Sequence, residues 1–184
     1  ALKKRKRDLF KQANFTLVSP SRWLQERTTK SVLREKPIRF IPNGINTHIF
    51  RPREKSVVRS IFNLPADKTV VLFIAAGGLD NEFKGGDVVR QLIKERPDQH
   101  FLVVGKCDAA IETEYSNVTT MDAINDQEHL ANVYSAVDVT IVPSKHEVLG
   151  LVAVESIACG TPVAVADVGG LRETVINNSC GIVM

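Results

Sequence analysis

The stretch PSKHEVLGLVAVESIACGTPVAVADVGGLRETV at positions 143–175 decides the fold of this chain. It follows an apolar run at residues 137–142 that predicts a strand, and its own apolar spacing predicts a helix over residues 150–159. Gly160 stands where helices commonly end on glycine. A strand over residues 162–166, a Gly-Gly turn and a short helix over residues 171–176 follow. Strands alternating with helices in this way are typical of a parallel sheet.

The same alternation extends through the rest of the chain. Because strands nearly continuous in Val, Ile and Ala are buried on both faces, they indicate a sheet with helices on each side. With right-handed crossovers, the prediction is an α/β fold with a Rossmann-like, doubly wound parallel sheet. The other predicted strands are residues 15–19, 38–41, 69–76, 100–104 and 181–184, and the other predicted helices are residues 21–33, 55–62, 86–95 and 127–136.

Composition and charge narrow the class of protein. The chain has 184 residues, 43% of them hydrophobic, and no apolar run long enough for a transmembrane helix. Cys107, Cys159 and Cys180 fit neither a disulfide framework nor a zinc site, and buried or incidental thiols in a reducing cytosol fit them best. Residues 1–40 hold 12 Lys/Arg and 3 Asp/Glu, a balance of +9, whereas residues 41–184 carry −6. The two parts are therefore expected to face different surroundings.

The start of the predicted helix at Gly150 has the chemistry of an anion site. The first N–H groups of a helix lack intrahelical partners and carry the positive end of its dipole, which suits a diphosphate. Glycine also leaves room for an anion to come close. Glu155, among apolar helix residues, needs a partner, which is either the vicinal hydroxyls of a ribose or a lysine or amide of the protein. Glu147 is either a sugar contact or an exposed loop charge.

Lys84 lies in Glu-Phe-Lys-Gly-Gly, shortly after the strand that ends at Gly77-Gly78. A lysine there either neutralises a phosphate as a point charge or is a solvated loop residue. Other chemistries lack their motifs: the sequence has no G-x-G-x-x-G after its first strand, no G-x-x-x-x-G-K-[ST] and no G-x-S-x-G. The four histidines are scattered without the spacing of metal ligands.

At these residues the chain resembles the large family-4 group of retaining glycosyltransferases, which have the two-domain GT-B fold. The resemblance covers nearly the whole chain from about Phe15. Two further stretches are similar, SPS at 19–21 and IPNGI at 41–45. The most specific pattern is Pro143-Ser144, Glu147, Gly150-Leu151, Glu155, Ala158, Gly160, Pro162-Val163, Gly169-Gly170 and Glu173.

The resemblance implies a role for each residue. Glu147 would be the catalytic contact to the transferred sugar, and Glu155 would hold the ribose hydroxyls. Lys84 would neutralise the leaving phosphates, while Gly77 and Gly105 would let the backbone approach the nucleotide. Residues 121–124 would flank the base. The diphosphate would bind the backbone N–H groups around Val148, Leu149, Gly150 and Leu151.

One position departs from the family pattern. Many members pair the lysine with an arginine, near the place where this chain has Gly78. The resemblance therefore implies only the lysine half of this cationic clamp, whereas Leu149 in place of a more usual Phe conserves apolar bulk. The resemblance implies no metal or other cofactor, because a helix start and cationic side chains do the work of a metal.

The domain prediction follows from the resemblance and the charge break. Residues 1–40 would be the tail of an N-terminal acceptor domain with its linker, and residues 41–184 the nucleotide-sugar-binding domain, truncated at its C-terminus. The expected function is transfer of a sugar from UDP- or GDP-sugar to a glycan or glycolipid acceptor bound by a missing domain. The alternative is a nucleotide-binding module that is inactive as an isolated fragment.

The basic cluster at residues 3–7 leaves three interpretations. A nucleic-acid or nuclear-targeting patch has weak support from five residues alone. A contact with anionic lipid headgroups fits better, and a solvated helix face remains the simplest account. We expect a cytoplasmic protein, with the cytoplasmic face of the membrane as a place of peripheral contact and without a nucleic-acid partner.

Overall fold

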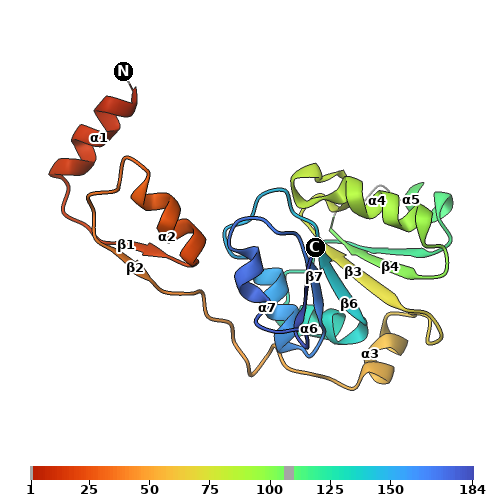
Figure 1. The fold of residues 1–184 in the computed structure, drawn as a ribbon. Helices are drawn as coiled ribbons and strands as arrows, with labels where there is room; N and C mark the ends of the chain where they lie inside the picture. The colour runs from red at the N-terminus through yellow and green to blue at the C-terminus, as the bar shows by residue number, and fades with distance from the viewer. Residues whose placement is uncertain (1, 106–109) are drawn as a thin grey trace.

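The computed structural model describes residues 2–105 and 110–184. Its larger part is a six-stranded parallel sheet with helices on both faces (Figure 1). The strands are β3 (Val70–Ile74), β4 (His100–Val104), β5 (Val118–Met121), β6 (Val139–Val142), β7 (Val163–Val165) and β8 (Gly181–Val183). The α-helices are α3 (Lys55–Ile61), α4 (Gly86–Glu95), α5 (Ala110–Glu114), α6 (Gln127–Ala136) and α7 (Leu151–Ala158), and the 3-10 turns are η1 (Gly78–Asp80), η2 (Glu82–Lys84) and η3 (Leu171–Thr174).

The strands lie in the order β5-β4-β3-β6-β7-β8. Counted from β3 as the first strand of this sheet, the order is the 3-2-1-4-5-6 of the Rossmann fold. The predicted α/β class with a doubly wound parallel sheet is confirmed. The direction of winding reverses between β3 and β6, and ligands of such sheets bind beyond the carboxyl ends of the strands at that switch point.

Alternate residues of the central strands enter two cores. Val70 and Leu72 pack with residues of α3 and α6, whereas Val71 and Phe73 pack with residues of α4 and α5. Successive side chains of a strand point to opposite faces, so a strand covered on both sides has no polar face. This is why β3 reads VVLFI in the sequence. Burial of each such side chain stabilises the folded state by about 1.5–3 kcal/mol.

The N-terminal part is a smaller unit with its own sheet (Figure 1). β1 (Leu17–Ser19) and β2 (Ile38–Phe40) pair in parallel, and the elements beside them are α1 (Leu2–Gln12) and α2 (Arg22–Thr29). The chain then runs to the larger part, where Phe50 is buried in the core of the six-stranded sheet. The predicted boundary between residues 40 and 41 stays a prediction, and β2 ends beside it.

The helix predicted over residues 21–33 is shorter in the structure. α2 ends at Thr29, and the N–H of Lys30 donates to the carbonyls of Arg27 and Thr28. The hydroxyl of Thr28 donates to the carbonyl of Leu24, and that of Thr29 to the carbonyl of Glu26. Such hydrogen bonds offer the backbone an alternative to the helix, which explains the early end.

Strand β5, helix α5 and the 3-10 turns η1 and η2 escaped prediction, and one helix is more open than expected. β5 has the polar sequence VTTM at the sheet edge, and α5 is five residues long. The basic cluster lies in a helix, α1, as its interpretation as a helix face requires. α7 was predicted to be largely buried, but only Ala153 and Ser156 are buried there, and Leu151 is 40% exposed. Lys106 and Cys107 lie outside the described residues.

The described part of the chain contains neither a candidate membrane span nor a candidate metal site. None of its helices is long and apolar enough to span a membrane. No group of three or more His, Cys, Asp or Glu side chains within residues 2–105 and 110–184 is arranged to hold a metal ion.

Candidate functional site

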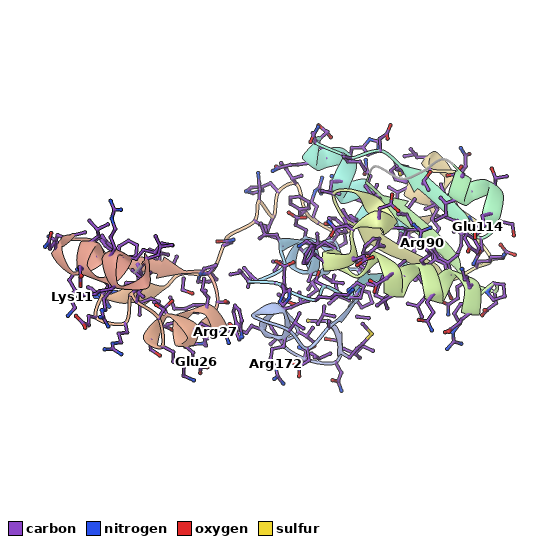
Figure 2. The ribbon with its side chains drawn as sticks, turned by 90° about the horizontal axis from the view of Figure 1, so that it is seen from above. Lys11, Glu26, Arg27, Arg90, Glu114 and Arg172 are labelled. Carbon is purple, nitrogen blue, oxygen red and sulfur yellow. The ribbon has the colours of Figure 1, made fainter. Side chains whose placement is uncertain are left out.

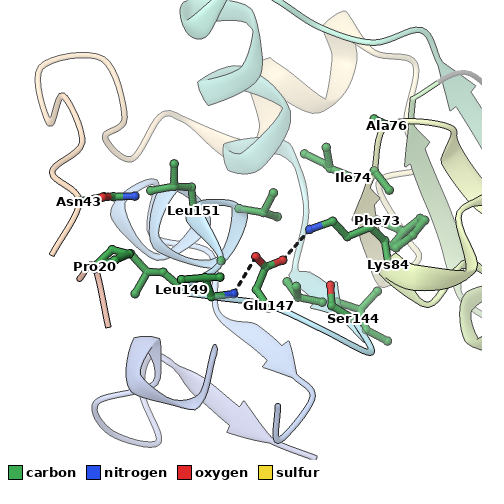
Figure 3. A pocket seen from close by; sticks show the side chains of 16 residues that line it. Pro20, Asn43, Phe73, Ile74, Ala76, Lys84, Ser144, Glu147, Leu149 and Leu151 are labelled. Carbon is green, nitrogen blue, oxygen red and sulfur yellow. Dashed lines mark hydrogen bonds and ion pairs between the residues drawn. The ribbon is translucent and has the colours of Figure 1, made fainter. Parts of the chain in front are cut away.

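A pocket of about 390 Å³ lies at the switch point between β3 and β6. Its floor is formed by the last residues of these two strands, and its mouth by a loop of residues 143–150, here called the pocket loop. Pro20 and Asn43 come from the N-terminal side of the chain and line the opposite wall (Figure 3). The lining residues are Pro20, Asn43, Phe73, Ile74, Ala75, Ala76, Lys84, Ile141, Val142, Ser144, Glu147, Val148, Leu149, Gly150, Leu151 and Val152.

Lys84 and Glu147 face each other across the pocket (Figure 3). Nζ of Lys84 lies 2.6 Å from Oε2 of Glu147, and the other carboxylate oxygen accepts from the N–H of Val148 at 3.2 Å. The side chain of Lys84 is 41% exposed and that of Glu147 18%. The sequence predicted separate contacts for them, with phosphate and with sugar. Without a ligand they form an ion pair with each other.

The pocket loop is held at both ends. At its start, the N–H of Lys145 donates to the carbonyl of Phe83, and its Nζ contacts Asp87 at 2.9 Å. That hydrogen bond from Lys145 lowers the pKa of Asp87. Further along, Gly169 and Gly170 support the loop from behind, because a Cβ on Gly169 would lie 1.7 Å from the carbonyl oxygen of Glu147. The position of the Glu147 side chain therefore depends on both neighbouring segments.

Ser144 is a functional candidate that the sequence placed in the motif but not in the site. Its side chain is 1% exposed and lines the pocket. Among the described residues, its Oγ has no hydrogen-bond partner. An unpaired buried hydroxyl costs about 1–3 kcal/mol, so a ligand or water is expected to bind it. The sequence carries no signal of this, since serine is common in loops.

Gly150 precedes the first residue of α7 with φ of +88°, a left-handed conformation that favours glycine. A Cβ at this position would lie 2.4 Å from Cδ1 of Leu171. Glycine is thus required by the backbone turn and by packing, whereas the sequence argument gave anion access as the reason. The N–H of Ala153 donates to the carbonyl of Gly150 at 3.1 Å, so the helix start leaves the N–H groups of Leu151 and Val152 without intrahelical partners. Gly150 and Leu151 line the pocket.

Glu155 lies one turn further along α7 and is half-buried. Its Oε2 accepts a hydrogen bond of 2.8 Å from the hydroxyl of Tyr134, which is completely buried in α6. Burial raises the pKa of Glu155, although this hydrogen bond acts in the opposite direction. Burial, together with the charge of Glu155, also raises the pKa of Tyr134 well above its ordinary value. The partner that burial demands is therefore a tyrosine, and a contact to ribose stays a prediction.

The predicted glycines are further from the pocket than the pocket loop is. Among the described residues, Gly77 and Gly105 are not part of its lining. Gly105 has φ of +138°, and a Cβ there would lie 1.9 Å from the carbonyl oxygen of Ala75. The close approach at Gly105 is thus to β3, and a role towards a nucleotide stays a prediction. Met121 and Ile124 are partly buried against the core, and their proposed place beside a base is likewise untested.

Gly78 occupies the position where many family members have an arginine. Its φ is +55°, and its N–H donates to the carbonyl of Ala75 at 2.8 Å. The lysine of the clamp is thus present in the pocket, whereas its usual partner is replaced by a left-handed turn.

The sequence of this chain is similar to those of known glycosyltransferases. The profile of the family "Glycosyl transferases group 1" matches residues 55–184. A D-inositol 3-phosphate glycosyltransferase from Thermobispora bispora is 37% identical over 161 residues, which are 77% of this chain and 37% of that protein. One from Acidothermus cellulolyticus is 33% identical over 184 residues, covering 88% of this chain and 40% of that protein. The chain spans less than half the length of these relatives.

Solved structures show the same fold. Sucrose-phosphate synthase from Thermosynechococcus elongatus superimposes with a TM-score of 0.82 at 32% identity, over 97% of this chain and 47% of that one. Anabaena HepE, solved with UDP and glucose, gives a TM-score of 0.76 at 18% identity, over 98% and 52% of the two chains. These neighbours are GT-B glycosyltransferases, as the resemblance implied. With a family match over most of its length and a relative 37% identical, the chain belongs to the group 1 glycosyltransferases.

Proposed function

We propose that this chain supplies the donor site of a retaining glycosyltransferase that moves a sugar from a UDP- or GDP-sugar to a glycan or glycolipid acceptor. The observation that carries the proposal is the pocket at the switch point of the sheet. It combines a cationic side chain, the start of a helix and an unpaired buried hydroxyl, those of Lys84, α7 and Ser144. Each of these groups favours an anion with several acceptor oxygens.

The diphosphate fits the end of the pocket formed by the pocket loop and α7. N–H groups around Val148, Leu149, Gly150 and Leu151 would donate to its oxygens, and Ser144 Oγ–H would add one donor. Lys84 would leave Glu147 and neutralise the leaving phosphate. These groups would do the work of a metal ion in the transfer, because fixed donors stabilise developing charge without reorganisation. We therefore propose a metal-independent reaction.

Glu147 would then contact the hydroxyls of the transferred sugar. Glycosyl transfer proceeds through a transition state of oxocarbenium character, which a nearby carboxylate stabilises. We propose front-face attack by the acceptor with the leaving phosphate as base, so that no covalent enzyme intermediate forms. HepE has been solved with UDP and glucose, which supports a nucleotide-sugar ligand for this fold.

A thermal-shift screen against UDP, GDP and ADP and their glucose or mannose derivatives tests the donor site directly. Ligand binding to the native state raises the melting temperature. We expect a UDP or GDP compound to raise it, with or without magnesium. No shift with any of the nucleotides would contradict the proposal. Nucleotide binding by the full-length protein without sugar transfer would favour the alternative, a nucleotide-binding module.

The acceptor and the location complete the proposal. A glycan or glycolipid acceptor places the protein in polysaccharide or glycolipid synthesis in the cytoplasm, at the membrane surface. The side chains of Lys4, Arg5, Lys6, Arg7 and Lys11 in α1 are exposed, and they would be attracted to anionic lipid headgroups. Sedimentation with phosphatidylserine vesicles at low and high salt tests this contact. Absence of cosedimentation at low salt would remove the membrane from the proposal.

A further inference from the structure

One carboxylate of the larger part of the chain binds the start of a helix in the N-terminal part. Glu173 lies in η3, and α2 begins 151 residues earlier at Arg22. Oε2 of Glu173 accepts from the N–H of Arg22 at 2.9 Å, and Oε1 accepts from the N–H of Trp23 at 2.8 Å. Oγ of Ser21 accepts from the N–H of Leu24 at 3.2 Å. The three N–H groups of the first helical turn are thus all paired, two of them through Glu173.

A tight contact lies beside this pair of hydrogen bonds. Ser21 is completely buried, although it stands at the beginning of an otherwise open helix. A Cβ on Gly170 would lie 2.5 Å from Cβ of Ser21 and 2.1 Å from the carbonyl oxygen of Val148. Glycine at this position therefore lets Ser21 and the pocket loop approach the same backbone. Figure 2 shows Arg27 of α2 and Arg172 of η3 where the two parts of the chain approach each other.

This contact is continuous with the pocket. The N–H of Gly170 donates to the carbonyl of Glu147 at 3.3 Å, which connects η3 to the pocket loop. On the other side, Pro20 directly precedes Ser21 and lines the pocket wall opposite Lys84 (Figure 3). Whatever holds α2 against η3 therefore also sets the distance between the Pro20 wall and the pocket loop.

We propose that Glu173 is a positioning residue that fastens the start of α2 to η3 and thereby fixes the Pro20 wall of the pocket. A carboxylate suits this task, because both of its oxygens accept and its charge complements the positive end of a helix. Glu173 does not line the pocket, so it acts on a ligand through Ser21 and Pro20. The effect on ligand affinity rests on the proposed function, whereas the fastening itself does not.

The chain offers a direct readout, because Trp23 is its single tryptophan. Amide exchange of Arg22 and Trp23, measured by NMR, and emission of the Trp23 indole both report on the contact. Glu173→Gln keeps one acceptor and Glu173→Ala keeps none. We expect exchange of the two amides to accelerate about tenfold or more in Glu173→Ala, and less in Glu173→Gln. Trp23 emission should shift to longer wavelength in the same order.

Glu26→Gln is the matched control, since it removes the same charge from an exposed position of α2, the helix that Glu173 contacts. It should leave the Arg22 and Trp23 amides unchanged. Amides of β3 and β4 report whether a variant still folds. They should be equally protected from exchange in the wild-type protein and in the three variants. If the Arg22 and Trp23 amides exchange at wild-type rates in Glu173→Ala, no fastening exists and the inference is wrong.

Titration of the same proteins with UDP and GDP separates the two parts of the inference. We expect affinity for the nucleotide that binds to fall about three- to tenfold in Glu173→Ala and to stay unchanged in Glu26→Gln. Faster exchange with unchanged affinity would mean that the contact is structural and does not position the pocket. If the wild-type chain binds neither nucleotide, the proposed function fails, and the exchange rates alone decide whether Glu173 fastens α2.

Discussion

Replacement of Glu147 by Gln should change the affinity for a nucleoside diphosphate and for a nucleotide sugar in opposite directions. Without a ligand, Lys84 is held by the Glu147 carboxylate at 2.6 Å. A diphosphate must take the lysine away from this partner, whereas a sugar hydroxyl gains the carboxylate as an acceptor. The variant therefore frees the cation for UDP but removes a contact to the sugar.

The magnitude follows from the exposure of the pair. Lys84 is 41% exposed, so solvent screens the attraction, and pairs of this kind contribute about 1 kcal/mol or less. Loss of that competition should strengthen UDP binding by up to about fivefold. A lost hydrogen bond between the carboxylate and a sugar hydroxyl costs about 1.5–3 kcal/mol, which corresponds to about 10- to 150-fold weaker binding. The net effect on UDP-glucose is thus a decrease.

Calorimetric titration with UDP and UDP-glucose measures both effects. If the guanine nucleotide is the ligand, GDP and GDP-mannose are used in place of UDP and UDP-glucose. Lys84→Ala should weaken both ligands by about 2 kcal/mol, or about 30-fold, because it removes the charge that meets the phosphate. Asp80→Asn is the control, since it breaks an exposed ion pair with Arg90 outside the pocket lining. If Glu147→Gln weakens UDP and UDP-glucose equally, the carboxylate supports the loop and does not contact the sugar.

Three further variants, and Gly44→Ala as the control for one of them, test other groups of the chain. Ser144→Ala should weaken UDP binding about three- to tenfold while stability to urea is kept or raised, because it removes an unpaired buried hydroxyl; lower stability would mean that the hydroxyl is already paired. Glu155→Gln should weaken nucleotide binding without loss of fold. Since burial raises the pKa of Glu155 above 4.5, wild-type stability should fall as pH rises from 4.5 to the folded-state pKa and then level off. Urea unfolding at several pH values should show no such fall in the variant. Gly105→Ala should cost about 2–4 kcal/mol in urea unfolding, because its Cβ would meet the carbonyl oxygen of Ala75, whereas Gly44→Ala, with open space, should change stability by less than about 0.5 kcal/mol.

The sheet could be predicted because its inner strands have no polar face. β3 and β4 are buried along almost their whole length, so burial selects apolar residues at every position except His100, the first residue of β4. β5 could not be predicted, for the opposite reason. It is an edge strand with two threonines, and its hydrogen bonds to β4 come from the backbone, which leaves no trace in the side-chain pattern.

The residues that line the pocket could be predicted in part, Lys84 from its place after a strand end and the others from one motif, but the contacts between distant residues could not. The pocket loop and α7 are one continuous motif, so Glu147 and Glu155 were found together. The ion pair of Lys84 with Glu147 spans 63 residues, and the hydrogen bond of Tyr134 to Glu155 joins two helices. Such contacts depend on how the elements pack, and no local pattern contains them. The unpaired hydroxyl of Ser144 is likewise a property of the folded pocket.

Through the contact of Glu173 with α2, the conformation of the pocket loop also depends on the N-terminal part of the chain. The loop rests on Gly169 and Gly170, and the same turn holds the start of α2 through Glu173. A ligand that tightens the loop against Gly170 therefore also favours the closed contact with Ser21, and by linkage a fixed α2 favours the ligand by the same free energy. Lys84 is the one Lys or Arg among the described lining residues, so such coupling would add affinity for the proposed donor beyond what its charge supplies. We therefore expect the position of the N-terminal part to affect donor binding.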